Sequence, residues 1–496
     1  MEGPTTQLTD AEKLAKIDAL TNGSTENREC PRTEYNNFKK ATVIYYQETA
    51  EGFKFLLCSD ETDPTTFKAI KSDWKISDAV ITFTGARAII EQTHGCLSPY
   101  CLGLLSEKKT LAIEDLIFAK VLHLPEVWKS KQYLETLKMV TENTCQFDDI
   151  NGEMVYFIGI STFDIELLNS AISNLGLKLC FQWFSEKELI ENGKGLVERS
   201  THQLAEKISF SKYIEKTRVY HKQPLSEQNI YILLLCKPPM NHSTYDVFYD
   251  HPSALYYGMF KRSGETWYTY NTATQDFPSE ELMKVTKAII VPGSPVSVYA
   301  PDEWGVKTRK WILDFHEKYT RTKLLGICFG EQLICESIGG KTEPMPKRRE
   351  NPMFYLSIVE TVEMSPEVLK LDFLKKKGRT VPLKAKIIES HGDEVTALPE
   401  GFEWMGGSET CKHEIIASKD GRYFGVQGHP EYTSAYFAAR VAMYIIAMRK
   451  LEPTLENYKK AEQELLENAY KEEPDFDIFR KLCYDFLKYD EWLLEQ

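Results

Sequence analysis

A cysteine held between two glycines is the feature of this chain best suited to covalent chemistry. Cys328 follows an apolar run that ends at Ile327, and a helical pattern covers about residues 331–338. Gly326 and Gly330 flank the cysteine, so the backbone can turn sharply there and pack closely. The N-terminus of a helix favours the thiolate, the nucleophilic form, over the thiol. The pattern predicts a strand-to-helix elbow that presents Cys328, although buried structural cysteines beside glycines are common.

A histidine and a glutamate further along the chain could complete this chemistry. His429 and Glu431 flank Pro430 just after the short apolar stretch 424–426. Residues two apart in an extended backbone face the same way, and proline stiffens the link between them. A thiol nucleophile needs a base, and the base needs a carboxylate that fixes its tautomer. Cys328, His429 and Glu431 can fill these roles, whereas a His-Pro-Glu sequence alone is usually a turn.

A Pro-Gly-Ser-Pro turn upstream of the cysteine could supply part of an oxyanion hole. The apolar run 288–291 is typical of a buried strand, and it ends in residues 292–295. Acyl transfer needs N–H donors directed at the developing oxyanion. The amide of Gly293 or Ser294 could be one donor, and the amide of Phe329, directly after the nucleophile, the other. The alternative is an ordinary loop after a strand.

Four motifs occur in the order found in class I glutamine amidotransferase domains, and the chain resembles that family over about residues 229–450. They are PGSP at 292–295, GICFGEQ at 326–332, SHGDEV at 390–395 and QGHPEY at 427–432. The pattern is that of the stand-alone γ-glutamyl peptidases of the superfamily. The resemblance implies a flavodoxin-like, three-layer α/β domain. It also implies attack by Cys328 on a γ-carboxamide, a γ-glutamyl thioester, and hydrolysis by water without a metal or organic cofactor.

The same resemblance places the loop after the predicted strand 385–388 beside the substrate. In related domains this loop helps to hold the α-amino and α-carboxylate end of the substrate, which would involve His391 and Asp393. His391 could instead be a structural loop residue, and His429 is preferred as the base because a carboxylate follows it. Gln332, one turn into the helix, is expected to face the substrate or the oxyanion loop. The basic run 347–349 is interpreted as a solvated loop and is left out of the site.

Glu331 is a departure from the family pattern, because many relatives have histidine or methionine at this position. An inward-facing carboxylate beside Cys328 would disfavour the thiolate. We expect Glu331 to face away from Cys328 on the first helical turn, where a negative charge suits the helix dipole.

Composition indicates a folded protein of two or three domains. The chain has 496 residues, of which 42% are hydrophobic and 12% aromatic,. A net charge of −13 argues against binding to nucleic acid or to an acidic membrane,. The first twenty residues contain no apolar core of a signal peptide, and no apolar run approaches membrane-spanning length. Eleven scattered cysteines without Cys-x-x-Cys pairs favour a reducing, cytoplasmic location over a disulfide framework or a metal site,.

The sequence pattern divides the chain into four parts. We expect a polar arm over 1–37, an α/β domain of no recognised family over 38–216, the amidotransferase-like domain over 228–451, and an acidic helical tail over 452–496, with a linker near 217–228. One apolar face of the tail should dock on a domain or a partner.

The elements of the second α/β domain follow from short apolar runs and from turn residues. Strands are predicted over 41–46, 53–58, 79–83, 154–158 and 177–184, and a helix over 111–122 that Pro125 stops. The segment 154–184 is typical of a βαβ unit, with a capping-box-like start at Ser161 and Asp164 and a stop at Gly176.

No phosphate-binding or pyrophosphatase loop occurs in the sequence, so an ATP-dependent synthetase that would consume ammonia is not recognised. This favours hydrolysis of a small γ-glutamyl substrate, either glutamine or a γ-glutamyl peptide. One alternative is a glutaminase subunit that delivers ammonia to a separate chain docked through the N-terminal domain or the acidic tail. The other is a silent binding or regulatory protein that retains the fold, although such domains usually lose the cysteine or the histidine.

Overall fold

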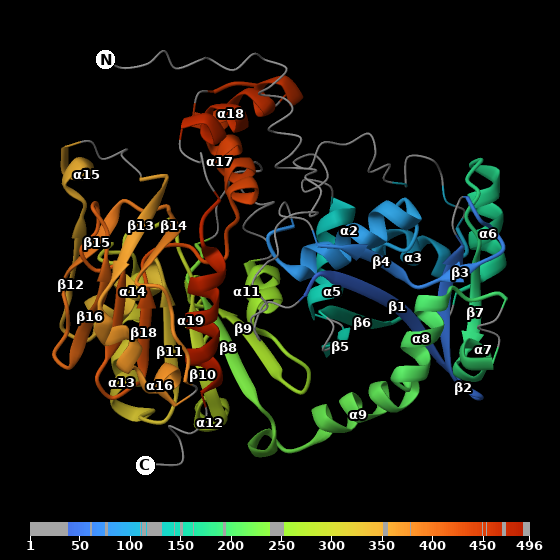
Figure 1. Cartoon of the computed structure of the whole chain (residues 1–496), viewed down its shortest axis with the longest axis horizontal. Coiled ribbons are helices and arrows are strands. Elements are labelled where there is room, and N and C mark those ends of the chain that lie inside the picture. The colour runs from blue at the N-terminus through green and yellow to red at the C-terminus, as the bar shows by residue number, and fades with distance from the viewer. Residues whose placement is uncertain are drawn as a thin grey trace.

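Two β-sheets lie side by side in the protein, each with its own helices (Figure 1). The computed structural model describes residues 38–59, 62–74, 78–109, 111, 116, 131–142, 144–148, 152–161, 163–191, 195–238, 252–350, 356–376, 378–448, 450–452, 454–468 and 473–489. The expected polar arm and most of the predicted helix over 111–122 lie outside the described residues. The mixed α/β architecture agrees with the prediction.

The larger sheet belongs to the C-terminal half of the chain. Its strands, in spatial order, are β14 (Lys384–Glu389), β13 (Ile358–Met364), β16 (Phe402–Gly407), β17 (Ile415–Ser418), β18 (Tyr423–Val426), β11 (Lys323–Ile327), β10 (Thr286–Val291), β8 (Ile230–Leu235) and β9 (Thr266–Asn271). The strands from β18 to β9 are parallel, and the others pair antiparallel. A separate ribbon pairs β12 (Lys341–Pro344) with β15 (Asp393–Ala397).

Helices cover both faces of this sheet, which gives the expected three layers. One face carries α12 (Glu280–Val285), α13 (Glu303–Lys318) and α14 (Phe329–Ser337), and the other carries α11 (Pro252–Phe260), α16 (Asp372–Lys375) and α19 (Phe476–Lys488). Alternate residues of β8 pack against the two helical layers. Ile232 lies in one apolar cluster with Phe315 of α13, and Leu233 lies in another with Leu482 of α19. Burial on both faces explains why the central parallel strands are continuous apolar runs.

The tail docks on this sheet through α19, as predicted. Phe479, Leu482 and Phe486 of α19 are buried against the sheet, and α19 contacts β11 and β14. The buried ammonium of Lys323 donates to the carbonyls of residues at the C-terminal end of α19, at 2.5–3.1 Å, where the negative end of a helix dipole lies,. Before α19, the chain forms α17 (Ser434–Met448) and α18 (Leu455–Asn468).

The N-terminal sheet has the order β3-β2-β1-β6-β5, with β4 paired to β1 and β7 to β2. These strands are β1 (Lys40–Thr49), β2 (Gly52–Ser59), β3 (Phe67–Lys68), β4 (Ile70–Asp73), β5 (Thr144–Asp148), β6 (Glu153–Gly159) and β7 (Phe181–Ser185). Helices α2 (Ile81–Thr93), α3 (Pro99–Ser106), α5 (Lys131–Glu142), α6 (Ile165–Asn174) and α7 (Glu186–Glu191) accompany them.

The structure confirms the predicted βαβ unit as β6, α6 and β7, with Gly176 at φ 75° after the helix. The predicted cap at Ser161 is wrong, because the side chain of Asp164 itself accepts from the amides of the first turn. The predicted strand over 79–83 is also wrong, since α2 begins at Ile81. Nearly every residue of α2 is buried, so the segment lacks the apolar–polar period that would have identified a helix,.

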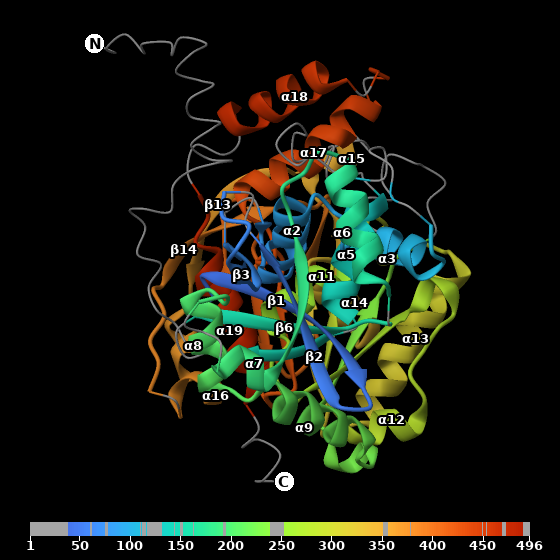
Figure 2. The same cartoon turned by 90° about the vertical axis from the view of Figure 1, so that its right-hand side faces the viewer.

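Two helices, α8 (Arg199–Lys207) and α9 (Phe210–Lys222), lead from the N-terminal region to β8, so the expected linker is helical up to Lys222. Figure 2 views the molecule from the side of the N-terminal sheet, and α9 runs below it. The two regions share one apolar cluster where α2 meets α11. Thr82 donates to the carbonyl of Ala254 at 2.7 Å, and Gly258 approaches Val80 so closely that a Cβ would clash. Helix α11 therefore lies between the N-terminal sheet and the amidotransferase-like sheet.

Candidate active site

The predicted elbow forms between β11 and α14. Cys328 has φ 54° and ψ −110°, a conformation that L residues rarely adopt and that costs about 1–3 kcal/mol,. Its amide donates to the carbonyl of Val426 at 2.8 Å, which ties the elbow to β18. A Cβ on Gly326 would lie 2.5 Å from the amide nitrogen of Glu331, and one on Gly330 would overlap the carbonyl of Val291. The two glycines are required by the close packing of strand and helix, as the sequence predicted.

His429 and Glu431 lie beside Cys328 at the end of β18. The amide of His429 donates to the carbonyl of Ile388 at 2.8 Å, which fixes the segment to β14. Nδ1 of His429 lies 2.7 Å from Oε1 of Glu431, and both residues are buried. This pairing leaves Nε2 as the ring nitrogen free to meet the thiol, and a side-chain hydrogen bond joins Cys328 and His429.

The absent side chain of Gly293 provides room for the cysteine and the histidine to meet. A Cβ on Gly293 would lie 3.0 Å from Cε1 of His429 and 3.7 Å from Cβ of Cys328. Three segments that are distant in the sequence therefore converge on one point. The predicted oxyanion loop borders this point.

Charge within the site favours a protonated histidine. Burial alone would lower the pKa of His429, but the negative charge of Glu431, the thiolate of Cys328 and the hydrogen bonds to both raise it to about 9,. Burial would raise the pKa of Glu431, but the charge of His429 and its hydrogen bond lower it below the usual value. The arrangement favours an imidazolium at His429 paired with a carboxylate at Glu431 at neutral pH.

Two tyrosines complete the surroundings of the histidine, and the sequence analysis missed both. Tyr256 of α11 donates to Oε1 of Glu431 at 2.9 Å. The ring of Tyr432 stacks on His429 with the centroids 4.6 Å apart and an angle of 11° between the planes. Tyr432 lies inside the QGHPEY motif and could have been found there, whereas no local signal connects Tyr256 with Glu431.

The predicted oxyanion donors differ in how the structure uses them. Phe329 is the first residue of α14, so its amide lies outside the internal hydrogen bonds of the helix,. Gly293 borders the Cys328–His429 pair. The hydroxyl of Ser294 donates to the carbonyl of Cys236 at 2.6 Å, so this side chain anchors the loop.

Gln332 and Asp393 form a buried link behind Cys328. The amide of Gln332 donates to the carbonyl of Asp393 at 2.9 Å and to Oε1 of Gln427 at 3.0 Å. The carboxylate of Asp393 accepts from Tyr299 and from Arg348, both at 2.8 Å. Gln332 thus holds the 390–393 loop to the motif that contains His429.

Arg348 corrects the interpretation of the basic run. Residues Pro346–Glu350 form the short helix α15, and Arg348 is half-buried. Its side chain packs on Gly392 so closely that a Cβ there would clash. A run of like charges in sequence cannot show that one member reaches a buried carboxylate, because the partner, Asp393, is distant along the chain.

His391 and Glu331 both point into a buried acidic region. Nδ1 of His391 lies 2.9 Å from the carbonyl of Asp393, and its Nε2 lies 3.2 Å from Glu389. Glu331 is fully buried. Its side chain lies against Gly425, where an added Cβ would be 2.7 Å from Cγ of Glu331. Its predicted place on the first helical turn is correct, but the carboxyl group lies in the core against the sheet.

Comparison with known proteins places this site in a family. Residues 247–442 match the family model of glutamine amidotransferase class-I. Gamma-glutamyl peptidase 3 of Arabidopsis thaliana is 30% identical over 266 residues, which are 52% of this chain and 94% of the relative. Gamma-glutamyl peptidase 4 of the same plant is 27% identical over 268 residues, 53% of this chain and 97% of the relative. The chain therefore belongs to the class I glutamine amidotransferase family, as its motifs predicted.

A further relative and a solved structure are also similar to part of this chain. The glutamine-hydrolyzing GMP synthase of Phenylobacterium zucineum is 39% identical over 145 residues, 29% of this chain and 24% of that protein. A glutamine amidotransferase structure from Thermotoga maritima covers 53% of this chain and 99% of its own at 15% identity, with a TM-score of 0.34. Among the helices of the described ranges, none has the length and apolar character needed to cross a membrane.

Proposed function

We propose that the protein hydrolyses a γ-glutamyl amide bond through a γ-glutamyl thioester on Cys328. The observation that carries the proposal is the meeting of Cys328, His429 and Glu431 in one buried cluster. The substrate would be glutamine or a γ-glutamyl peptide. The names of its relatives, gamma-glutamyl peptidases and a glutamine-hydrolyzing synthase, support this substrate class.

The first half of the reaction forms the thioester. The thiolate of Cys328 attacks the carbonyl carbon of the γ-carboxamide, and the negative charge moves to the carbonyl oxygen. The amides of Phe329 and Gly293 donate hydrogen bonds to that oxyanion. The imidazolium of His429 then protonates the leaving nitrogen, the C–N bond breaks, and ammonia or an amine leaves.

The second half releases glutamate. The neutral imidazole of His429 takes a proton from water, and the resulting hydroxide attacks the thioester carbonyl. The C–S bond breaks, and the thiolate is restored beside a protonated His429. Glu431 holds the ring in the tautomer that keeps Nε2 directed at the reacting atoms, and Tyr256 holds Glu431,. These steps use only groups of the protein and water.

Three measurements with one set of substrates test the proposal. The purified chain is incubated with glutamine, glutathione and γ-glutamyl dipeptides, and the release of ammonia, glutamate and the leaving peptide is followed. A glutamine analogue with a chloroketone in place of the amide serves as a thiol label. We expect turnover of at least one substrate and labelling at Cys328, both lost in Cys328→Ala.

Cys335→Ala is the matched control, because Cys335 is a second buried thiol on the same helix. It should retain labelling and turnover. A folded chain that neither labels nor turns over any substrate would overturn the proposal in favour of a binding protein. Ammonia release only after addition of a partner chain would instead assign the protein as a glutaminase subunit.

A further inference from the structure

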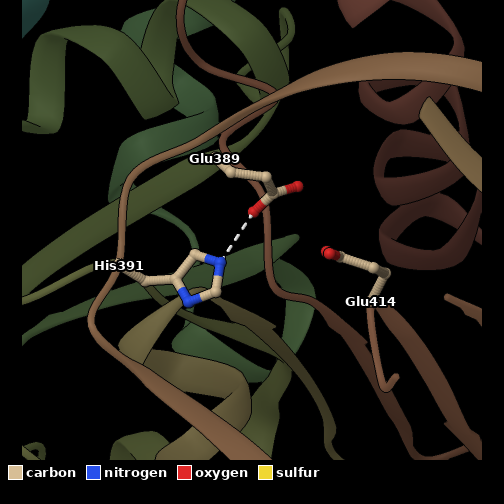
Figure 3. A group of neighbouring side chains, drawn as sticks. All are labelled: Glu389, His391 and Glu414. Carbon is tan, nitrogen blue, oxygen red and sulfur yellow. Dashed lines mark ion pairs between the residues drawn. The ribbon is translucent and has the colours of Figure 1, made fainter. Parts of the chain in front are cut away.

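Two glutamates and a histidine meet in the core behind the candidate nucleophile. Glu389 ends β14, His391 follows two residues later, and Glu414 directly precedes β17. They are 0%, 2% and 1% exposed. One ligand atom from each lies within 4.8 Å of the others, and the side chains point toward one another (Figure 3).

The carboxyl groups of Glu389 and Glu414 are close enough to share a proton, but several polar atoms of this cluster have no other hydrogen-bond partner among the described residues. Both carboxylate oxygens of Glu389, Oε2 of Glu414 and Nε2 of His391 are buried without one. Nε2 of His391 and Oε2 of Glu389 approach to 3.2 Å, the distance of an ion pair but without hydrogen-bond geometry. Glu331, on the neighbouring helix, also has both oxygens unpartnered and interacts electrostatically with Glu389 and Glu414. Buried carboxyl groups left in this way are costly.

No lysine or arginine in the described part of the chain neutralises these acids. Protonation of the acids would leave the cluster without negative charge. A bound cation would instead keep them ionised and fill the unused lone pairs.

The tautomer of His391 shows where a cation could bind. The ring nitrogen Nδ1 lies 2.9 Å from the carbonyl of Asp393, and a carbonyl can only accept, so Nδ1 carries the hydrogen,. In the neutral ring, Nε2 then carries no hydrogen, and its lone pair faces a carboxylate oxygen of Glu389. Two acceptors in contact repel unless a proton or a metal cation lies between them. A backbone carbonyl that orients the other nitrogen is also the usual support of a metal-bound histidine.

The second glutamate is oriented in the same manner. The hydroxyl of Ser408 donates to Oε1 of Glu414 at 2.7 Å, which leaves Oε2 for the cluster. An imidazole with two carboxylates is a donor set for first-row divalent transition metals. Such ions take nitrogen and oxygen ligands at about 2.0–2.2 Å. The three ligand atoms lie within 4.8 Å of one another, so they would need to draw together by up to about 1 Å on binding,.

We propose that Glu389, His391 and Glu414 bind one divalent transition-metal ion of the zinc or manganese type. The two carboxylates balance its charge, and Glu331 lies next to it. The ion would fasten the end of β14, the 390–393 loop and the start of β17. Its role is structural, since it would join three segments of the fold.

The site adjoins the residues that position the candidate base. Gly428, the residue before His429, packs directly on Glu389. A Cβ on Gly428 would lie 2.6 Å from Oε1 of Glu389. The carbonyl of Ser390 lies 4.0 Å from Sγ of Cys328. The proposal does not depend on the proposed hydrolysis and would stand if the protein turned over no substrate.

Metal content and thermal unfolding of the full chain test this site. The chain is unfolded with a chelator, refolded with Zn²⁺ or Mn²⁺ or without metal, and freed of loose ions. We expect one ion per chain by elemental analysis, held by the native protein against chelator and released on unfolding. Free metal about a hundredfold above Kd should raise the Tm by about 2–4 °C.

Variants separate this site from adventitious binding. Glu414→Gln should lose the ion and the rise in Tm, whereas Glu462→Gln, which changes a buried glutamate on α18, should retain both. Should Glu414→Gln fail to fold, the absorption spectrum of the Co²⁺-refolded wild-type chain reports a bound ion with a nitrogen and oxygen ligand set. A wild-type chain that refolds without binding any of these ions, or an unchanged metal content in folded Glu414→Gln, would overturn the proposal and indicate protonated acids.

Discussion

Replacing Glu431 with glutamine should show how far the proposed chemistry depends on one buried charge. The substitution preserves the shape of the side chain and removes its charge. The pKa of His429 is about 9, compared with 6.5 for an ordinary histidine, even though burial opposes protonation. A difference of about 2.5 units corresponds to about 3 kcal/mol of stabilisation of the imidazolium. The charge of Glu431 is the first of the causes that raise this pKa.

Loss of this stabilisation should reduce the rate by two effects. A loss of up to about 3 kcal/mol lowers kcat/KM by as much as about 150-fold. A glutamine amide can also donate to Nδ1 and select the tautomer with a hydrogen on Nε2, which cannot accept a proton from water. Together the two effects predict a loss of about 10²- to 10⁴-fold at pH 7.

The dependence of stability on pH gives an independent measure of the same charge. The pKa of His429 is higher in the folded chain than in the unfolded chain, so protonation stabilises the fold,. This contribution is complete below pH 6.5 and is lost as the pH rises through about 9. The free energy of unfolding of the wild-type chain should therefore fall over this window, and Glu431→Gln should flatten the fall.

The assay compares kcat/KM of the wild type and Glu431→Gln from pH 6 to 10, with urea unfolding at the two ends of the range. Glu303→Gln, an exposed carboxylate on α13, is the matched control and should behave as the wild type. In the wild type, activity should decline above about pH 9, because His429 must be protonated to release the leaving amine,. A variant with activity within about threefold of the wild type and an unchanged alkaline decline would refute the assigned role of Glu431.

Three further substitutions test the support of the site. Gly330→Ala would place a Cβ 1.9 Å from the carbonyl oxygen of Val291, so urea unfolding should show a free energy of unfolding lower by about 3 kcal/mol or more,. A decrease of less than about 1 kcal/mol would contradict this packing. Tyr256→Phe removes one hydrogen bond to the acid of the proposed triad, and kcat should fall about tenfold with KM unchanged; full activity would show that this bond is dispensable,. Arg480→Met removes donors to the carbonyls of Pro430 and Ala79, and the thermal midpoint should fall by several degrees, an outcome that an unchanged midpoint would exclude,.

The elbow could be predicted from the sequence because its requirements are local. Gly326 and Gly330 leave no room for a Cβ, and that need is written as a spacing around Cys328. The apolar runs of the central parallel strands were equally informative, since strands covered on both faces have little choice of residue. The βαβ unit of the N-terminal region was found from its turn residues for the same reason.

Local pattern failed where burial was uniform or where a partner was distant. The segment that begins α2 resembled a strand because the helix is buried on nearly all sides. The charged run around Arg348 resembled a solvated loop because its partner Asp393 is contributed by another part of the chain. Glu331 could be placed on a helical turn, but the sequence could not show that the carboxyl group is buried among other acids.

The sequence by itself determined the family, the strand-to-helix elbow at Cys328 and the order of the motifs, because each depends on a few neighbouring residues and on backbone sterics. The tertiary structure alone decided which side chains meet. It brought Tyr256 to Glu431 across 175 positions and gathered Glu389, His391 and Glu414 in one buried cluster. Such contacts depend on how sheets and helices pack, and no spacing along the chain encodes them.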